Sequence, residues 1–216
     1  MAEKEKMGRR ERKKLMLRDA LITASYELFA LKGFDETRIE DITDKVDVSN
    51  RTFFRYFSSK EDVVLDYQQA EHESFIAALN RRPFQEPVIT ALRHAAVEVV
   101  RKYESGSADR FMMRQELLRS HPLVRAKALQ QSEERSASIV SLIAQRMEAN
   151  VTLDLRPSIV VGMIDYAHCA AYDAWKKKKS ASVLYSDVLN EVFLIIESGL
   201  NFSAKYKPDD HSDDVC

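Results

Sequence analysis

Apolar residues recur every three or four positions along the first third of the chain, which is the spacing of amphipathic helices. Between Arg12 and Lys32 the repeated positions are Leu17, Leu21, Ala24, Leu28 and Leu31. Gly33 follows directly and is typical of a helix C-terminus. The pattern predicts a first helix over residues 12–32.

Two short helices are predicted to follow. Thr37 and Glu40 have the spacing of a capping box, which opens a helix of about nine residues. Ser49 is a favoured N-cap for the next helix, in which Phe53 and Phe57 lie four positions apart and face the first two helices. Residues 15–60 therefore predict a three-helix domain with a tight turn between its second and third helices.

The helical period continues to the end of the chain, and no segment shows a strand pattern. Pro83 and Pro87 mark a linker, while Pro122 and Pro157 fall where a helix tolerates proline in its first turn. Six further helices are predicted, at 59–80, 88–104, 108–119, 122–148, 157–178 and 182–204. The fold class is all-α with about nine helices.

Charge is distributed unevenly along the 216 residues, whose net charge is −1. Residues 1–60 carry +3 and residues 61–216 carry −4; the first 14 residues are rich in Lys and Arg, and the end of the chain is rich in Asp. We expect a basic flexible arm over 1–14, a second domain over 61–205 and an acidic disordered tail over 206–216. The basic end indicates a polyanion partner, although a solvated arm without a partner has a similar composition.

Several function classes are disfavoured by what the sequence lacks. Cys169 and Cys216 have no disulfide or metal-ligand spacing, and neither a glycine-rich phosphate loop nor a nucleophile paired with a base is recognisable. No apolar run is long enough to span a membrane. We therefore expect a cytoplasmic protein that is not an enzyme and needs no metal or cofactor.

The third helix has the character of a DNA-reading helix. With Phe53 and Phe57 facing inward, the exposed positions are those of Ser49, Asn50, Arg51, Thr52, Arg55 and Tyr56. Arginine can bind guanine through two hydrogen bonds, and asparagine can bind adenine in the same way. Two short capped helices behind a basic arm thus predict a helix-turn-helix.

The segment from Gly33 to Val63 reads G-F-x-x-T-x-I-x-D-I-x-x-x-V-x-V-S-x-R-T-F-F-R-Y-F-x-S-K-E-D-V and resembles the DNA-binding signature of the tetracycline-repressor (TetR) family. The resemblance implies a homodimer on a palindromic operator in double-stranded DNA. It places Thr37, Tyr56 and Lys60 on phosphates, and Arg38 and Arg51 on bases.

Three positions depart from the family pattern. Asp47 replaces the usual turn glycine, which aspartate tolerates because it enters the left-handed region more readily than most residues. Thr43 replaces a common alanine. Phe54 stands where a tyrosine often donates its hydroxyl to phosphate, so that contact is expected to be lost.

Apolar stripes in the second domain are consistent either with a ligand pocket or with plain core. The segment from Arg114 to Ala126, with Trp175, resembles a TetR subgroup with acyl-CoA-like ligands, which implies a small, largely apolar effector. The predicted pocket residues are Phe111, Met112, Gln115, Leu118, Ile143, Met147, Met163, Ile164, Ala167, His168 and Tyr172.

The last two predicted helices are apolar on more than one face and so need two partners each. In the family the corresponding helices form a four-helix bundle between subunits. The predicted dimer interface consists of Ile159, Gly162, Tyr166, Val192 and Ile196. Lys176 to Lys179 lie at a helix C-terminus, where cations are favoured.

These features together predict a transcriptional repressor that a small ligand releases from its operator. A ligand can do this only if it binds the two arrangements of the dimer with different affinity. The alternative is a DNA-binding interaction protein of the same fold that has no small-molecule effector. A helical module without DNA would leave the basic arm and the Ser49 to Lys60 motif unexplained.

Overall fold

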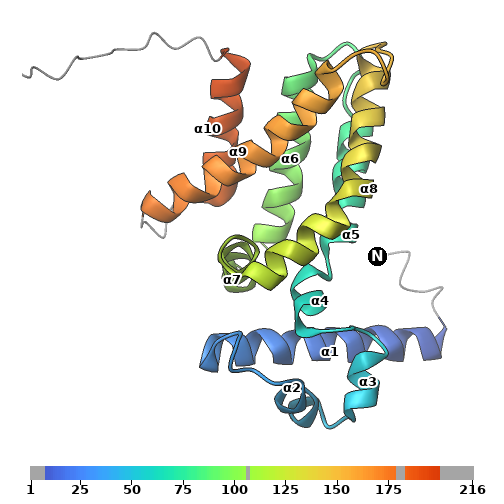
Figure 1. Ribbon diagram of the computed structural model, residues 1–216, viewed down its shortest axis with the longest axis vertical. Coiled ribbons are helices and arrows are strands. Elements are labelled where there is room, and N and C mark those ends of the chain that lie inside the picture. The colour runs from blue at the N-terminus through green and yellow to red at the C-terminus, as the bar shows by residue number, and fades with distance from the viewer. Residues whose placement is uncertain (1–7, 106–107, 179–182, 200–216) are drawn as a thin grey trace, which may run out of the picture.

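The computed structural model describes residues 8–105, 108–178 and 183–199, and these residues form ten α-helices and no strand (Figure 1). The helices, in chain order, are α1 (Arg9–Lys32), α2 (Ile39–Val46), α3 (Asn50–Phe54), α4 (Lys60–Leu65), α5 (Gln68–Asn80), α6 (Val88–Glu104), α7 (Ala108–Ser120), α8 (Pro122–Arg146), α9 (Arg156–Lys178) and α10 (Tyr185–Glu197). The all-α prediction is confirmed. The predicted bounds of 88–104 are those of α6, while residues 182 and 200–204 of the predicted last helix lie outside the described residues.

Local backbone signals end and start the first three helices as expected. Gly33 follows α1 with a φ of 87°, and Asp47 follows α2 in the left-handed region with φ 56° and ψ 52°. Ser49 caps α3, because its Oγ accepts a hydrogen bond from the Thr52 amide at 3.3 Å. Each of these residues acts on backbone within a few positions of itself.

The predicted capping box at Thr37 and Glu40 is wrong by one residue. The N-cap of α2 is Arg38, whose amide donates to Asp41 Oδ2 at 2.8 Å. The Thr37 hydroxyl instead donates backward to the Gly33 carbonyl at 2.7 Å. Thr37 therefore closes the turn between α1 and α2 rather than opening the second helix.

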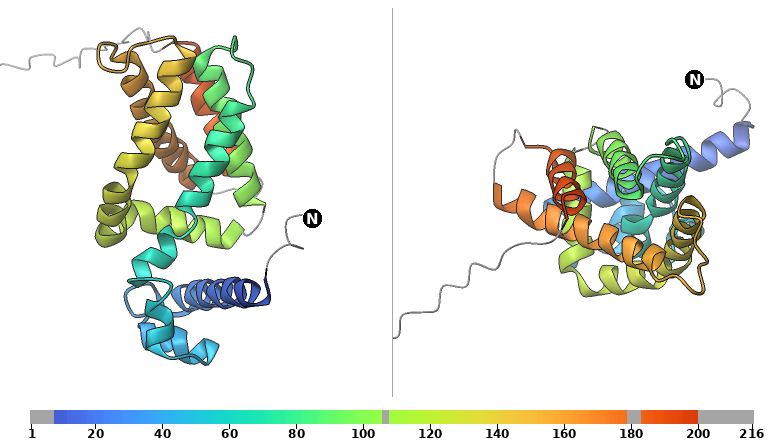
Figure 2. Two further views of the ribbon diagram at one scale, coloured as in Figure 1. Left: turned by 90° about the vertical axis from the view of Figure 1, so that its right-hand side faces the viewer. Right: turned by 90° about the horizontal axis from the view of Figure 1, so that it is seen from above.

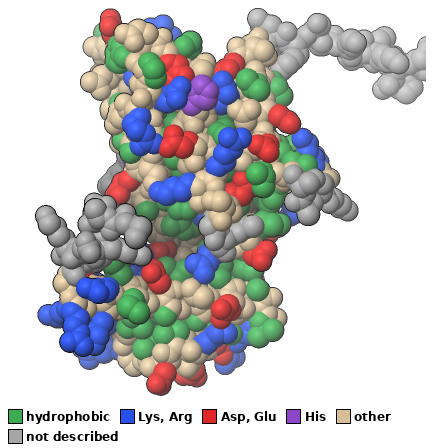
Figure 3. Space-filling view, turned by 180° about the vertical axis from the view of Figure 1, so that it is seen from behind, with side chains coloured by type: hydrophobic (Ala, Val, Ile, Leu, Met, Phe, Trp, Pro, Cys, Tyr) green, Lys and Arg blue, Asp and Glu red, His purple; other side chains and the backbone are tan. Residues whose placement is uncertain are grey.

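The basic arm is helical for much of its length. Because α1 begins at Arg9, residues 9–14 extend that helix beyond the predicted start at residue 12, and the flexible arm expected over 1–14 is wrong for them. Residues 1–7, like the expected acidic tail, lie outside the described residues. Seen from behind, Lys and Arg side chains gather at this end of α1 (Figure 3, lower left).

The single helix predicted over 59–80 is interrupted. α4 ends at Leu65 and α5 begins at Gln68, with Asp66 and Tyr67 between them and Tyr67 at φ −94° and ψ 0°. Asp66 pairs with Arg18 of α1, and the ring of Tyr67 lies beneath the guanidinium of Arg114. Both partners come from distant segments, so nothing local in the sequence marks the break.

Two hydrophobic cores organise the fold. The first joins α1 to α4 through residues such as Leu21, Phe53 and Val63, each 0% exposed, and it includes Val124 of α8. This core extends past the predicted domain end at residue 60, since Val63, Val64 and Leu65 belong to it.

The second core lies among α5, α6, α8, α9 and α10 and includes Phe111 of α7. α10 packs against α6 and α9, and α8 packs against α9. The two parts are stacked along the long axis of the molecule, with α4 and α7 between them (Figures 1 and 2).

Candidate DNA-binding site

The recognition helix α3 is anchored by aromatic side chains on one face. Phe53 is 0% exposed and Phe57 is 3% exposed, and their ring centroids lie 5.6 Å apart in the first core. The opposite face is open and contributes to a hollow of about 450 Å³. Its lining residues are Ser49, Arg51, Thr52, Phe54 and Arg55.

Arg38 before α2 and Arg51 in α3 are exposed. Arg55 is also exposed, and its guanidinium lies 5.1 Å from the ring centroid of Tyr56. One of its nitrogens donates to the Tyr56 hydroxyl at 3.4 Å. Arg51 and Arg38 thus present their guanidinium groups outward, whereas Arg55 lies against its neighbour.

Asn50 has a different environment from the one expected of a base-reading residue. Its Oδ1 accepts a hydrogen bond from the Thr43 hydroxyl at 2.7 Å, and its Nδ2 donates to Glu40 at 3.1 Å. The side-chain amide therefore joins α3 to α2. Thr43, the departure from the family pattern, supplies one of these two bonds.

The expected phosphate contacts of Thr37 and Lys60 are also not supported by the geometry. Thr37 is 1% exposed and its hydroxyl is already bonded to Gly33. The Lys60 ammonium donates to the carbonyl oxygens of Phe34, Asp35 and Thr37 at 2.6, 3.0 and 3.2 Å. Because an ammonium has three donors, Lys60 holds the turn before α2 and has none left for DNA in this arrangement.

Sequence reasoning omitted Phe54 from the contact set, although it is 53% exposed and lines the hollow on α3. An apolar side chain at this place can contact the methyl group of thymine. The sequence does indicate this exposure: Phe53 and Phe57, four positions apart, define the inward face of the helix, and Phe54 does not lie on that face.

The predicted pocket residues divide into three groups. Phe111, Ile143, Ile164, Ala167 and Tyr172 are at most 8% exposed and belong to the second core. Met147 is partly buried against the same core, while Gln115 and Met163 are half-buried.

The third group departs from the expectation. Met112 is 46% exposed, and Leu118 packs against the first core instead of the second. Both lie on α7, which contacts both cores. The prediction assigned the apolar pocket residues of this helix to the second core, which is wrong for Leu118.

His168 is half-buried on α9 and is held by Tyr185. Its Nδ1 lies 3.0 Å from the Tyr185 hydroxyl, and that hydroxyl also donates to the His168 carbonyl at 3.2 Å. Burial lowers the pKa of His168 to about 4. The imidazole is therefore neutral at physiological pH.

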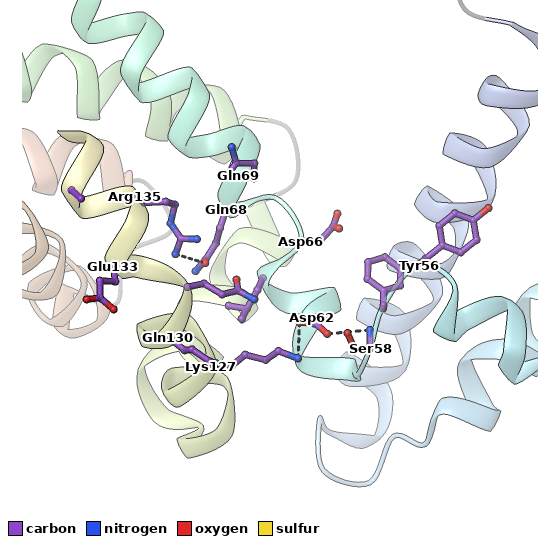
Figure 4. Close-up of a pocket in the computed structure, with 14 residues that line it drawn as sticks. Tyr56, Ser58, Asp62, Asp66, Gln68, Gln69, Lys127, Gln130, Glu133 and Arg135 are labelled. Carbon is purple, nitrogen blue, oxygen red and sulfur yellow. Dashed lines mark hydrogen bonds and ion pairs between the residues drawn. The ribbon is translucent and has the colours of Figure 1, made fainter. Parts of the chain in front are cut away.

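A groove of about 1070 Å³, lined mainly by polar residues, lies between residues 56–69 and residues 127–137 of α8 (Figure 4). Lys127 of α8 reaches across to Asp62 of α4 at 2.7 Å, and Arg135 donates to Gln68 at 2.8 Å. Tyr56 is the only member of the predicted site that lines this groove. Its polar lining does not match the apolar pocket expected from sequence.

Exposed apolar side chains lie on α9 and α10. Ile159 is 59% exposed and Tyr166 is 79% exposed, and the space beside Gly162 is open. Val192 and Ile196, however, are partly buried against their own core, so they do not form the free face of α10. That face carries Leu194 and Ile195, which are 46% and 49% exposed.

Within the described ranges, no group of three or more His, Cys, Asp or Glu side chains is placed to hold a metal ion. In the same ranges, every helix is too short or too polar to cross a membrane.

The α2–α3 pair, with its left-handed turn residue, its anchored aromatic side chains and its exposed arginines, defines a helix-turn-helix DNA-binding protein. Residues 21–67 match the family model for bacterial regulatory proteins of the tetR family, and residues 86–201 match the MftR C-terminal domain. The chain belongs to the TetR family of transcriptional regulators.

Individual relatives agree with this assignment. The chain is 35% identical over 161 residues to the HTH-type transcriptional regulator TcmR of Streptomyces glaucescens, covering 72% of this chain and 71% of TcmR. The fatty acid degradation regulator FadR from Bacillus halodurans superposes with a TM-score of 0.64 at 19% identity, covering 86% of this chain and 96% of that structure. FadR from Bacillus subtilis in complex with stearoyl-CoA superposes with a TM-score of 0.59 at 18% identity. The match covers 84% of this chain and 98% of that structure.

Proposed function

We propose that the protein is a homodimeric repressor that binds a palindromic operator through α3 and is released by a small, largely apolar ligand of its C-terminal domain. The observation that carries the proposal is the α3 surface, where exposed Arg51 stands on a helix fixed from behind by Phe53 and Phe57. An arginine so placed can bind guanine in the major groove through two hydrogen bonds.

The roles of the individual contacts follow from their geometry. Arg38 and Arg51 are proposed to read bases, while Ser49, Thr52 and the Arg55–Tyr56 pair contact the backbone. The basic start of α1 adds phosphate contacts that carry no sequence information. Asn50, Thr37 and Lys60 act indirectly by holding α2 and α3 in place.

Dimerisation is proposed through the exposed apolar face of α9 and α10. Ile159, Tyr166, Leu194 and Ile195 are exposed apolar side chains on these two helices, and exposed apolar patches mark protein interfaces. Two α3 helices must lie about 34 Å apart to enter successive major grooves, which makes the operator palindromic. The ligand is proposed to favour a spacing that no longer fits, and FadR bound to stearoyl-CoA supports an acyl-CoA-like molecule as one candidate.

Selection of DNA from a random pool tests the operator proposal. The full chain should enrich a palindrome with half-site centres about one helical turn apart. Arg51→Ala should cost about 1–3 kcal/mol on that palindrome and relax one base pair in each half-site, with little effect on random DNA. Arg81→Ala, which removes an equal charge at the end of α5, is the control and should leave the selected sequence unchanged. Enrichment of no palindrome would contradict the proposal.

A further inference from the structure

Arg114 stands in the middle of α7, where the two parts of the molecule meet. Its side chain is 4% exposed, and its guanidinium carbon lies 3.4 Å from the ring centroid of Tyr67 and 5.0 Å from that of Phe111. Burial lowers the pKa of Arg114 to about 9, which still leaves the group charged at neutral pH. A buried charge of this kind needs a counter-charge or a full set of hydrogen bonds.

Within the described ranges, Arg114 lacks that compensation on one edge. Neither Nε nor Nη2 has a hydrogen-bond partner. The nearest carboxylate oxygen belongs to Glu71 of α5 and lies 3.9 Å from Nη2, beyond hydrogen-bond distance. Burial raises the pKa of Glu71 to about 7, so this carboxyl is only partly ionised at neutral pH.

The surroundings of this edge contain further donors without partners in the described residues. The Tyr26 and Tyr67 hydroxyls are buried and have none. Burial raises the pKa of Tyr26 to about 12, and the nearby positive charges of Arg114 and Arg110 oppose that rise. One charged edge and two neutral hydroxyls of residues near Arg114 therefore lack partners within the described ranges.

The chemistry of the edge identifies the class of group that it can bind. Nε–H and an Nη–H of arginine point in parallel, and their spacing matches the two oxygens of a carboxylate. We propose that the Nε–Nη2 edge of Arg114 binds the carboxylate of an otherwise apolar effector. This inference rests on the proposed ligand-released function and makes the ligand an amphipathic carboxylate, a different class from the acyl-CoA-like candidate considered above.

An occupant of this edge would contact parts of both domains. Tyr26 belongs to α1, Tyr67 lies in the break between α4 and α5, and Arg114 belongs to α7. Arg110, one turn before Arg114, donates to Thr23 of α1 at 3.2 Å and lies 5.3 Å from the ring centroid of Tyr26. A carboxylate bound here would thus act on α1 directly, and Glu71 would compete with it for Arg114.

Acetate and its neutral analogue acetamide, at equal ionic strength, test the proposal on the free protein without DNA. The readouts are the Nε–H signal of Arg114 in protein with ¹⁵N-labelled arginine and the midpoint of thermal unfolding. Acetate should shift the signal saturably and raise the midpoint, whereas acetamide should do neither. Arg114→Lys keeps the charge but loses the two-donor edge, so it should abolish the response and also identify the signal.

Glu71→Gln provides the opposite test at about pH 8, where Glu71 is ionised in the wild type. Removing the competing negative charge should tighten acetate binding about tenfold. Glu73→Gln makes the same charge change at an exposed position of α5 and should bind acetate like the wild type.

Two results would overturn the inference: equal effects of acetate and acetamide on the Arg114 signal, or equal tightening by Glu71→Gln and Glu73→Gln. Should Arg114→Lys fail to fold, the comparison of the two glutamine variants still decides. Because no step uses DNA, failure here leaves the operator proposal intact. Failure of the operator selection would likewise not explain a missing acetate response.

Discussion

The ammonium group of Lys60 lies 4.6 Å from the centroid of the Phe34 ring and donates a hydrogen bond to the carbonyl oxygen of the same residue. With its other two donors on Asp35 and Thr37, Lys60 joins the start of α4 to the turn before α2. The residue that the family pattern places on phosphate is thus part of the internal support of the helix-turn-helix.

Lys60→Ala should therefore act mainly on stability. Loss of charged hydrogen bonds to backbone carbonyls is expected to lower the free energy of unfolding by about 1–3 kcal/mol in urea titrations. The slope of log K for DNA against log salt should stay near the wild-type value, because no phosphate contact is removed. Lys45→Ala, which breaks an exposed pair with Glu27, should change stability little. A variant of normal stability whose slope falls by about 1 would show a phosphate contact instead.

Phe54→Tyr should restore the hydroxyl that the family pattern has at this position. Phe54 is 53% exposed, so the added group needs no partner in the free protein. We expect binding to tighten by about 0.5–1.5 kcal/mol, by the same amount on operator and random DNA, because a phosphate contact carries no sequence information. Fluorescence anisotropy with both DNAs measures this. Phe57→Tyr, at a position 3% exposed, should destabilise the fold instead; tightening on one sequence alone would contradict the phosphate assignment.

Ile195→Asp should separate the subunits without unfolding them. Ile195 is 49% exposed on the free face of α10, so a charge there is harmless in the monomer but costs several kcal/mol in an apolar interface. Light scattering should report a monomer with wild-type helicity, and operator affinity should fall with it. Leu31→Asp, at an apolar position on α1 that is 79% exposed, should stay dimeric. A dimeric Ile195→Asp protein would contradict the proposed interface.

The neighbouring residue should behave differently. Ile196 is partly buried against the core of its own subunit, so Ile196→Asp should lower the free energy of unfolding of each subunit. Thermal unfolding monitored by circular dichroism distinguishes the two variants. If Ile196→Asp unfolded like the wild type but was monomeric, Ile196 would belong to the dimer interface after all.

Stability should decrease in mild acid because of His168. Burial holds its pKa near 4, below the ordinary value of 6.5, so between these pH values the unfolded chain binds a proton that the folded chain does not. The stabilisation is present above pH 6.5 and is lost as the pH falls toward 4, amounting to at most about 3 kcal/mol. The difference between urea titrations of wild type and His168→Gln across this range measures it. A constant difference would show that His168 does not titrate in this window.

Predictions from sequence succeeded where a residue acts on neighbouring backbone. Gly33, Asp47 and Ser49 each set the conformation or the hydrogen bonds of adjacent residues, and helix ends could be placed from them. Lys60 could not be interpreted in this way, because its partners lie 23 to 26 residues earlier in the chain. The break at Tyr67 likewise depends on Arg114, which follows 47 positions later.

The apolar stripes show a second limit of prediction from sequence. A stripe indicates that a helix face is buried, but it does not identify the helix or subunit that buries it. On α10, Val192 and Ile196 face the same subunit while Ile195 remains uncovered. On α7, Leu118 belongs to the first core, although its neighbours suggested the second. These choices depend on how whole helices pack, which one amphipathic pattern leaves open.

The attachment of α8 to the DNA-binding domain has a mechanical consequence. Val124 is buried in the first core and Lys127 pairs with Asp62, so the N-terminal end of this helix is fixed beside α4. With 25 residues, α8 is about 37 Å long at 1.5 Å per residue. The helix is thus held at its N-terminal end by the DNA-binding domain. A tilt of about 5° about that end moves its C-terminal end by about 3 Å. Repacking of a few ångströms around Met147, at the far end, would therefore turn the DNA-reading unit of that subunit by several degrees.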